Sequence, residues 1–388
     1  MRQKMMKLRL WQRLESTFTK NTPFKVFLLS ILITGLSYGL YKGILDNFLA
    51  EIVGMGELDR GITEFFRELP GILLIFVLAA FFMLSAEMLY KAGAVIMLVG
   101  MAMHAILPPE KVLMTLAICV YSFGEHVQLG MKNTLSLKCA RPDRGGAALG
   151  AQNAAMQIGA LAGYLVVVAV FAAFAQRQPY TAFFAVAAVM AGISAVLSLQ
   201  ITGKSETDAT KRRWYFHKKY TKYYMLEMFY GANAATISLL FAVSAVACFF
   251  ASPVVGRIID RLGYKVVMGS DTLILVIVCF FYGFAHHIFP RDVAFVVCCV
   301  NYVLVSVISL ASMASNVYVK DLSKDGEEVK ATISTGVSIN HVITVFIALF
   351  GGWIWKTLGM ELLFIVSAVL GLCNSAYAAS IKTAKTSP

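Results

Sequence analysis

The sequence predicts an all-α, polytopic membrane protein built from two repeated bundles of helices. Of its 388 residues, 59% are hydrophobic and only 14% are charged, whereas soluble proteins carry about 25% charged residues. The apolar residues form consecutive blocks, most of them near the roughly twenty residues that a helix needs to span a bilayer. Basic residues collect in alternate connections between these blocks, a distribution typical of cytoplasmic loops.

The apolar blocks define eleven segments that we expect to be membrane-spanning. Six precede a polar, basic linker, over 25–49, 64–86, 89–107, 112–136, 146–174 and 179–201. Five follow it, over 223–255, 264–288, 292–316, 331–355 and 361–380. We therefore expect a cytoplasmic N-terminal segment (1–24), a first bundle of six spans (25–201), a cytoplasmic linker (202–222), a second bundle (223–380) and a cytoplasmic tail (381–388).

The net charge of +12 fits a membrane protein better than a nucleic-acid-binding protein. Its basic residues flank apolar blocks near the N-terminus and in the linker, at Arg2, Lys4, Lys7, Arg9, Arg13, Lys211, Arg212, Arg213, Lys218, Lys219 and Lys222. The positive-inside rule then places the N-terminus in the cytoplasm, and we expect a multi-pass protein of the cell (inner) membrane. The seven cysteines show no zinc-ligand spacing, so we expect neither a metal site nor a cofactor.

One region is too short for its expected topology. Both flanks of the stretch 223–255 are basic and should be cytoplasmic, which requires two crossings, yet its 33 residues cannot form two full spans. The chain could turn as a hairpin at Gly231–Ala232–Asn233, cross once and invert the second half, or lack a segment. We adopt the first interpretation, a short or distorted seventh helix.

A loop in the second half carries the most specific motif, "GRIIDRLGYK". Its conspicuous residues are Gly256, Arg257, Asp260, Arg261, Gly263 and Lys265. Glycines permit close helix approach, and an aspartate can accept hydrogen bonds from a helix N-terminus. The alternative is that the basic residues only anchor the loop on the cytoplasmic side. The equivalent first-half loop, "LSAEMLYKAG", keeps Lys91 but lacks the aspartate and both glycines.

This loop, the two six-span halves and the basic linker resemble the major facilitator superfamily, whose signature is Gly-x-x-x-Asp-Arg-x-Gly-x-Arg/Lys. The resemblance covers nearly the whole chain. It implies that Asp260 braces a cytoplasmic gate near Gly145–Gly146. It also implies a central cavity that binds substrate, lined chiefly by the first, fourth, seventh and tenth spans.

Polar residues at mid-membrane depth are the candidates for substrate binding or proton coupling. Glu125 and His126 lie on the fourth span, where an ionisable group is costly and usually faces a cavity or a partner. Glu125 is our candidate for binding a proton, and the alternative is a hydrogen bond that joins two helices. Tyr38 on the first span, Gln157 on the fifth, and Asn340 and His341 on the eleventh complete the set. The amides and imidazoles could equally bridge packed helices.

Two pairs near the outer ends of the first and second spans could form ion pairs. Lys42 and Asp46 are four residues apart and share a helix face. Arg67 and Glu68 are expected at the outer surface, where interfacial anchoring is the simpler interpretation.

No catalytic constellation or phosphate-binding loop is present in the sequence, so we do not expect an enzyme. The prediction is a secondary active transporter that moves a small solute by alternating access, coupled to protons or another ion. The alternative is a non-transporting or degenerate membrane protein of the same fold, a sensor or scaffold. The expected partners are a small-molecule substrate and the lipid bilayer, without nucleic acid, and we expect a monomer.

Overall fold

The computed structural model describes residues 14–20, 22–173, 179–202, 218–230 and 238–381, and these contain helices and no β-strand beyond one isolated bridge. The first half comprises α2 (Phe24–Glu51), α3 (Glu57–Ala80), α4 (Ala86–Ile106), α5 (Lys111–Cys139), α6 (Gly145–Ala173) and α7 (Tyr180–Leu199). The second half comprises η1 (Lys218–Tyr220), α8 (Thr221–Tyr230), α9 (Ser238–Leu262), α10 (Tyr264–Ile288), α11 (Arg291–Ile308), η2 (Ser309–Ser312), α12 (Met313–Leu322), α13 (Gly326–Leu358) and α14 (Met360–Ala379).

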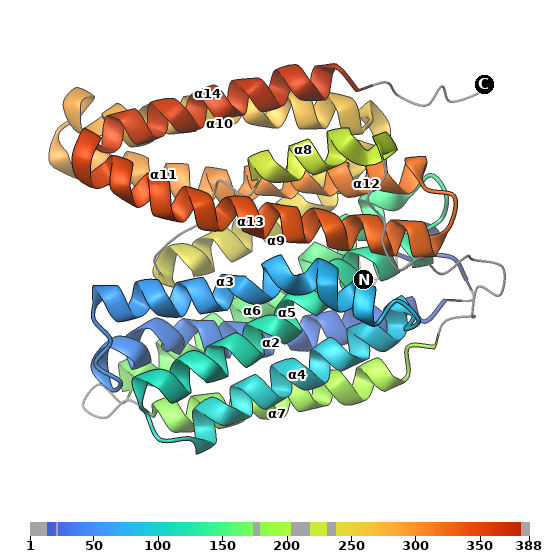
Figure 1. The fold of residues 1–388 in the computed structure, drawn as a ribbon, viewed down its shortest axis with the longest axis horizontal. Helices are drawn as coiled ribbons and strands as arrows, with labels where there is room; N and C mark the ends of the chain where they lie inside the picture. Colours follow the sequence, from blue (N-terminus) through green and yellow to red (C-terminus); the bar gives the residue numbers. More distant parts are fainter. Residues whose placement is uncertain (1–13, 21, 174–178, 203–217, 231–237, 382–388) are drawn as a thin grey trace, which may run out of the picture.

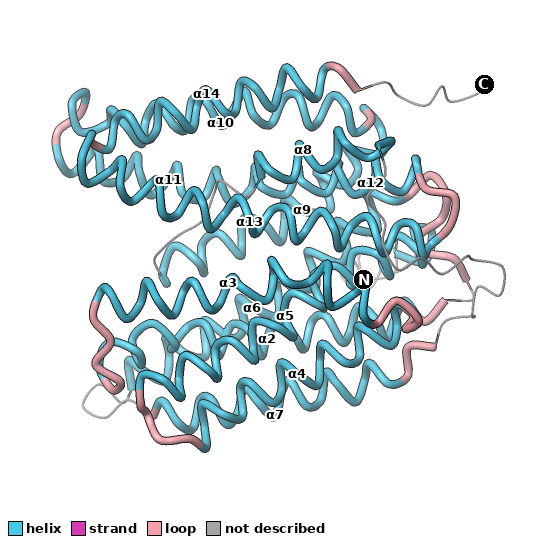
Figure 2. Tube along the Cα trace, in the orientation of Figure 1, coloured by secondary structure: helices cyan, strands magenta, loops and turns pink. Residues whose placement is uncertain are grey.

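The two halves form two helical bodies that lie side by side (Figures 1 and 2). Within the first body α2 packs on α6 and α7, and α4 packs on α5; within the second, α10 packs on α14 and α11. The bodies meet where α6 contacts α9 and where α13 contacts α3 and α5. These contacts place α3, α5 and α13 around the middle of the protein, where the polar candidates lie.

Side-chain exposure agrees with a bilayer around both bodies. Large apolar side chains are exposed on the outer faces, such as Phe76, Val196, Phe250 and Phe295, with 56–69% of their surface accessible. Nine helices of the described residues are long and apolar enough to cross a membrane. The predicted all-α, multi-pass fold is therefore confirmed.

The structure describes only the first part of the seventh span, so its expected shortness stays a prediction. Its described helix, α8, has ten residues, a length of about 15 Å and half of a bilayer core. The turn expected at Gly231–Ala232–Asn233 lies outside the described residues. Lys222 donates to the carbonyl oxygen of Ser380, and Asp260 contacts the start of α6.

Both flanks of the short region thus lie at one end of the protein, together with residues 139–146 and 320–328. We call this end the inner end. A single crossing would put these flanks at opposite ends, so their shared end favours two crossings between them.

The second span differs from its expected bounds. It was expected over 64–86, but α3 runs from Glu57 to Ala80. Its first turns are polar, so hydropathy missed them, and the Asp59 side chain caps them by accepting from the Gly56 amide at 3.1 Å. This earlier start moves Arg67 and Glu68 about 15 Å into the helix.

Candidate functional site

A cavity of about 220 Å³ lies within the first half, and His341 of the second half closes one side of it. It is bounded by α2, α3, α4, α5, α6 and α13. Its polar and charged walls include Tyr38, Arg67, Glu125, His126, Lys132 and His341. Four of the six predicted binding or coupling residues, Tyr38, Glu125, His126 and His341, therefore share one space although they come from three helices.

Glu125 and His126 both line this cavity, although neighbouring helix residues point about 100° apart. Glu125 is partly exposed and accepts a hydrogen bond from the Tyr121 hydroxyl at 3.2 Å. His126 is buried, and its Nδ1 lies 2.7 Å from the backbone oxygen of Ser122. Because a carbonyl only accepts, Nδ1 carries the proton of neutral His126.

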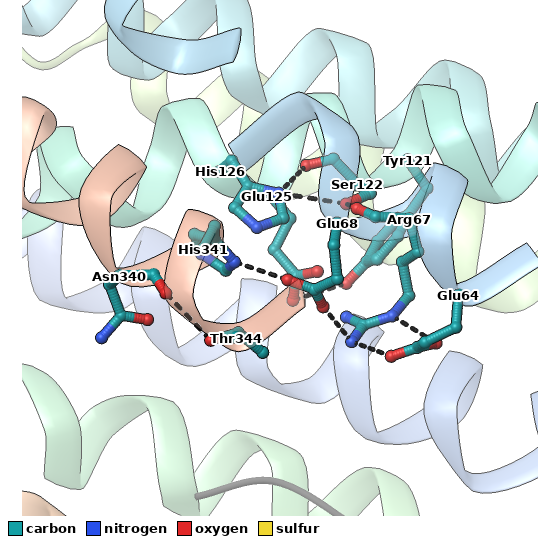
Figure 3. Close-up of polar contacts among 10 residues, drawn as sticks. All are labelled: Glu64, Arg67, Glu68, Tyr121, Ser122, Glu125, His126, Asn340, His341 and Thr344. Atoms are coloured by element: carbon teal, nitrogen blue, oxygen red, sulfur yellow. Dashed lines mark hydrogen bonds and ion pairs between the residues drawn. The ribbon is translucent and has the colours of Figure 1, made fainter. Parts of the chain in front are cut away.

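Arg67 and Glu68 form the predicted ion pair, but their expected position at the outer surface is wrong. The Glu68 side chain is only 8% exposed. It contacts Arg67 through one oxygen and lies 2.5 Å from Nδ1 of His341 through the other. Arg67 also donates from Nε to Glu64 at 2.8 Å. Figure 3 shows this chain of contacts, which runs from Glu64 on α3 to His341 on α13.

The contact between Glu68 and His341 joins the two halves. Other hydrogen bonds between the halves lie nearer the inner end, and they include Ile75–Ser338, Gly146–Asp260, Ala147–Asp260, Arg141–Lys320 and Leu84–Lys330.

The other predicted residues lie elsewhere. Asn340 points away from the cluster (Figure 3) and donates to the backbone oxygen of Glu227 at 3.0 Å. Gln157 is half-buried on α6 and is not among the described residues that line the central cavity. Asp46 pairs with Arg60 at 3.1 Å, so the expected Lys42–Asp46 ion pair is wrong among the described contacts. The extra polar turns at the start of α3 bring Arg60 to Asp46.

Sequence reasoning missed two charged residues that line cavities. Lys132 follows Glu125 by seven residues, two helical turns that return it to the same face of α5, and it lines the central cavity. Glu227 on α8 lines a second cavity of about 210 Å³ with Asn340, Asp271 and Asn374. Both residues interrupt apolar stretches, and that signal could have identified them.

Three side chains could together hold a metal ion, which spacing along the chain did not predict. Glu68, His126 and His341 each offer one ligand atom, and these atoms lie within 4.8 Å of one another. They come from α3, α5 and α13, so a search for neighbouring ligands in the sequence could not find them. A second such group, His286, His287 and Glu361, is largely exposed.

The signature loop contacts the first half where the sequence placed it. Asp260 accepts from the backbone amides of Gly146 and Ala147, at 2.8 and 2.9 Å, at the N-terminus of α6. A Cβ on Gly256 would lie 2.3 Å from the Gly146 carbonyl oxygen, so only glycine allows this approach. Gly263 separates α9 from α10 with a φ of 82°, a conformation that favours glycine.

The basic residues of the loop play a different part. Arg257 donates to its own helix, at the backbone oxygen of Pro253, and is exposed, as is Arg261. Lys265 is half-buried. These positions fit the simpler interpretation, in which the cations face the inner solvent.

The first-half loop lacks the aspartate but still contacts the second half. Lys330, which is 6% exposed on α13, donates to the backbone oxygen of Leu84 at 2.9 Å. The second half therefore plays opposite roles at the two loops. At its own signature loop, the Asp260 carboxylate accepts hydrogen bonds from the first half. At the first-half loop, the Lys330 ammonium donates a hydrogen bond to the first half.

Comparisons with known proteins agree on the fold. Residues 222–386 match the family model of the Major Facilitator Superfamily. A search of curated protein sequences gives no match. Among solved structures, the human organic anion transporter MFSD10 (TETRAN) is similar, with a TM-score of 0.72 and 10% identity over 91% of this chain and 98% of that chain.

Two bacterial proteins are similar as well. FucP, the fucose:proton symporter of E. coli, has in its outward conformation a TM-score of 0.67 and 12% identity, over 92% of this chain and 99% of that chain. A bacterial homologue of the iron transporter ferroportin, in an outward-facing state, has a TM-score of 0.70 and 12% identity, over 91% of this chain and 98% of that chain. The predicted resemblance to this superfamily of membrane transporters is confirmed.

Proposed function

We propose that this chain, which has the fold of the major facilitator superfamily, is a secondary active transporter of a small solute. The observation that carries the proposal is the central cavity. It lies in the first half at mid-membrane depth, with polar walls that include Glu125 and Lys132, and His341 closes it from the second half. Binding sites of repeated-bundle transporters lie at this depth, where the repeats meet.

The contacts between the halves support alternating access as the mode of transport. The hydrogen bonds between the halves run from the inner end to Glu68–His341, so solute would enter from the outer side in this arrangement. Opening the inner end requires that Asp260 and Lys330 leave the first half. The positive-inside rule supports a cytoplasmic position for the inner end, in the cell (inner) membrane. A monomer remains our expectation for the oligomeric state.

Proton coupling is the finer part of the proposal, and we assign it to Glu125. Its carboxylate faces the cavity beside the Tyr121 hydroxyl, and a charge at this depth is costly unless solute or solvent reaches it. Transport would then be linked to proton uptake from one side and release to the other. The similar structures include an organic anion transporter, a fucose:proton symporter and a homologue of an iron transporter, so the fold does not select among substrates.

The test is counterflow and gradient-driven uptake in proteoliposomes, with a library of small solutes. We expect saturable flux for one solute class, and loss of accumulation in Glu125→Gln at unchanged protein level. Glu110→Gln is the matched control, because Glu110 is an exposed carboxylate at the outer start of the same helix. Full accumulation by Glu125→Gln would remove its coupling role. Absence of saturable flux for every solute would favour a non-transporting sensor or scaffold.

A further inference from the structure

We propose that Glu68, His126 and His341 form a binding site for a divalent first-row transition-metal ion, such as Zn²⁺ or Fe²⁺. Two imidazoles and one carboxylate are a common ligand set for these ions. The three ligand atoms already lie within 4.8 Å of one another, between the halves of the protein (Figure 3). The proposal goes beyond transport and does not depend on it.

The tautomer of His126 leaves the correct nitrogen for a metal. Nδ1 donates to the Ser122 carbonyl, so Nε2 of the neutral ring keeps its lone pair. Metal-bound histidines are usually fixed in this way, through a hydrogen bond from the second nitrogen to a backbone oxygen or a carboxylate. The Ser122 hydroxyl in turn donates to the Arg67 carbonyl, which ties α5 to α3 at this point.

Glu68 is held in a similar manner. Arg67 binds one carboxylate oxygen, and the other points to His341 at 2.5 Å. Ligand atoms of a tetrahedral zinc site with bonds near 2.0–2.1 Å lie about 3.4 Å apart. The Glu68–His341 contact would therefore widen by about 1 Å, and the farthest ligand atoms would close by about 1.4 Å. Rotation of the glutamate side chain provides movements of this size.

The backbone of α3 makes room for both imidazoles. A Cβ on Gly71 would lie 2.5 Å from Cγ of His341 and 2.8 Å from Cδ2 of His126. The two rings are nearly perpendicular, with centroids 4.1 Å apart. Because any larger residue would displace them, Gly71 allows these two rings to stand together beside Glu68.

The charge of the surroundings favours a cation. Three carboxylates, Glu64, Glu68 and Glu125, lie near the cluster, and Arg67 carries one opposing charge beside them. Lys132 lines the central cavity two helical turns after Glu125 on α5, and its positive charge offsets part of the negative charge that Arg67 leaves. With both imidazoles neutral, three carboxylates against two cations leave the region one negative charge, which favours binding of a cation.

The bound ion would have an open coordination position and would join the halves. His126 and His341 line the central cavity, so a fourth ligand could be water or a solute in that space. Glu68 and His126 belong to the first half and His341 to the second. The ion would thereby stabilise the arrangement seen here and oppose separation of α13 from α3 and α5.

Co²⁺ binding to the purified full-length chain, without a histidine tag, tests the site directly. The background carries His286→Gln and His287→Gln, which remove the exposed group. We expect one Co²⁺ per chain, displaced by Zn²⁺, with visible absorption bands of nitrogen–oxygen coordination. Glu68→Gln, His126→Gln and His341→Gln should each weaken binding at least about tenfold to hundredfold, as even outer-shell changes do.

The matched control is His104→Gln. His104 is also buried, and its Nδ1 also lies close to the carbonyl four residues earlier, at 2.9 Å, but it belongs to no ligand group among the described residues. This variant should bind Co²⁺ as the background does. His341→Cys adds a readout that loss of structure cannot imitate, a thiolate-to-cobalt charge-transfer band. No binding in the background, equal loss in His104→Gln, or absence of that band in His341→Cys would overturn the proposal.

Discussion

The contact of Asp260 with the start of α6 leads to our most quantitative prediction. Asp260→Asn keeps the shape of the side chain but removes its charge, and it replaces one accepting carboxylate oxygen by an amide nitrogen that cannot accept. The carboxylate now accepts two amide hydrogens at 2.8 and 2.9 Å. Charge-assisted hydrogen bonds contribute about 1.5–3 kcal/mol each, and an acidic group at a helix N-terminus adds about 0.3–1 kcal/mol.

Since the amide retains one neutral bond, we expect the closed inner end to lose about 2–4 kcal/mol. This corresponds to a shift of about 30- to 1,000-fold toward open forms. Spin labels on cysteines at Met83 and Lys324, both exposed at the inner end, would report it as a longer distance population in a background without other cysteines. Arg257→Gln is the control, because Arg257 bonds only within its own helix among the described contacts. Unchanged distances in Asp260→Asn, or equal changes in the control, would refute the gate role.

Three further variants test neighbouring features. Gly256→Ala should open the inner end as Asp260→Asn does, because the new Cβ would lie 2.3 Å from the Gly146 carbonyl oxygen; the same spin-label pair measures it. Gly263→Ala should lower unfolding stability by about 1–2 kcal/mol, since its φ is 82°; thermal unfolding in detergent measures it, and an unchanged midpoint would contradict the argument. Lys132→Gln should raise KM more than it lowers the maximal rate if Lys132 contacts solute, and unchanged kinetics would exclude that contact.

The fold could be predicted from the sequence because its main signal is local. About twenty consecutive apolar residues predict a membrane span wherever they lie in the chain. Basic residues in alternate loops then predict which loops are cytoplasmic. The errors have local causes too. The polar first turns of α3 carry no hydropathy signal, and that one misplaced start put Arg67 and Glu68 at the surface.

The site could be predicted only in part, because side-chain direction depends on neighbouring helices. Glu68 and His341 are 273 positions apart and yet in contact, and nothing in either segment alone indicates the other. Asn340 precedes His341 by one residue and faces a different cavity, as the 100° turn per residue allows. The position of a residue along a span predicts its depth in the membrane. It does not predict which residue of another helix the side chain contacts.

The incomplete signature of the first half does not imply a damaged gate. A lost aspartate would matter if the inner end lost a polar contact between the halves, but Lys330 supplies one by donating to Leu84. A buried ammonium needs an acceptor as much as a buried carboxylate needs donors, so the contact has the same physical function with the polarity reversed. Asp260 at one of the two related loops and Lys330 at the other thus each make a polar contact with the first half at the inner end, as the proposed alternation between two states would need.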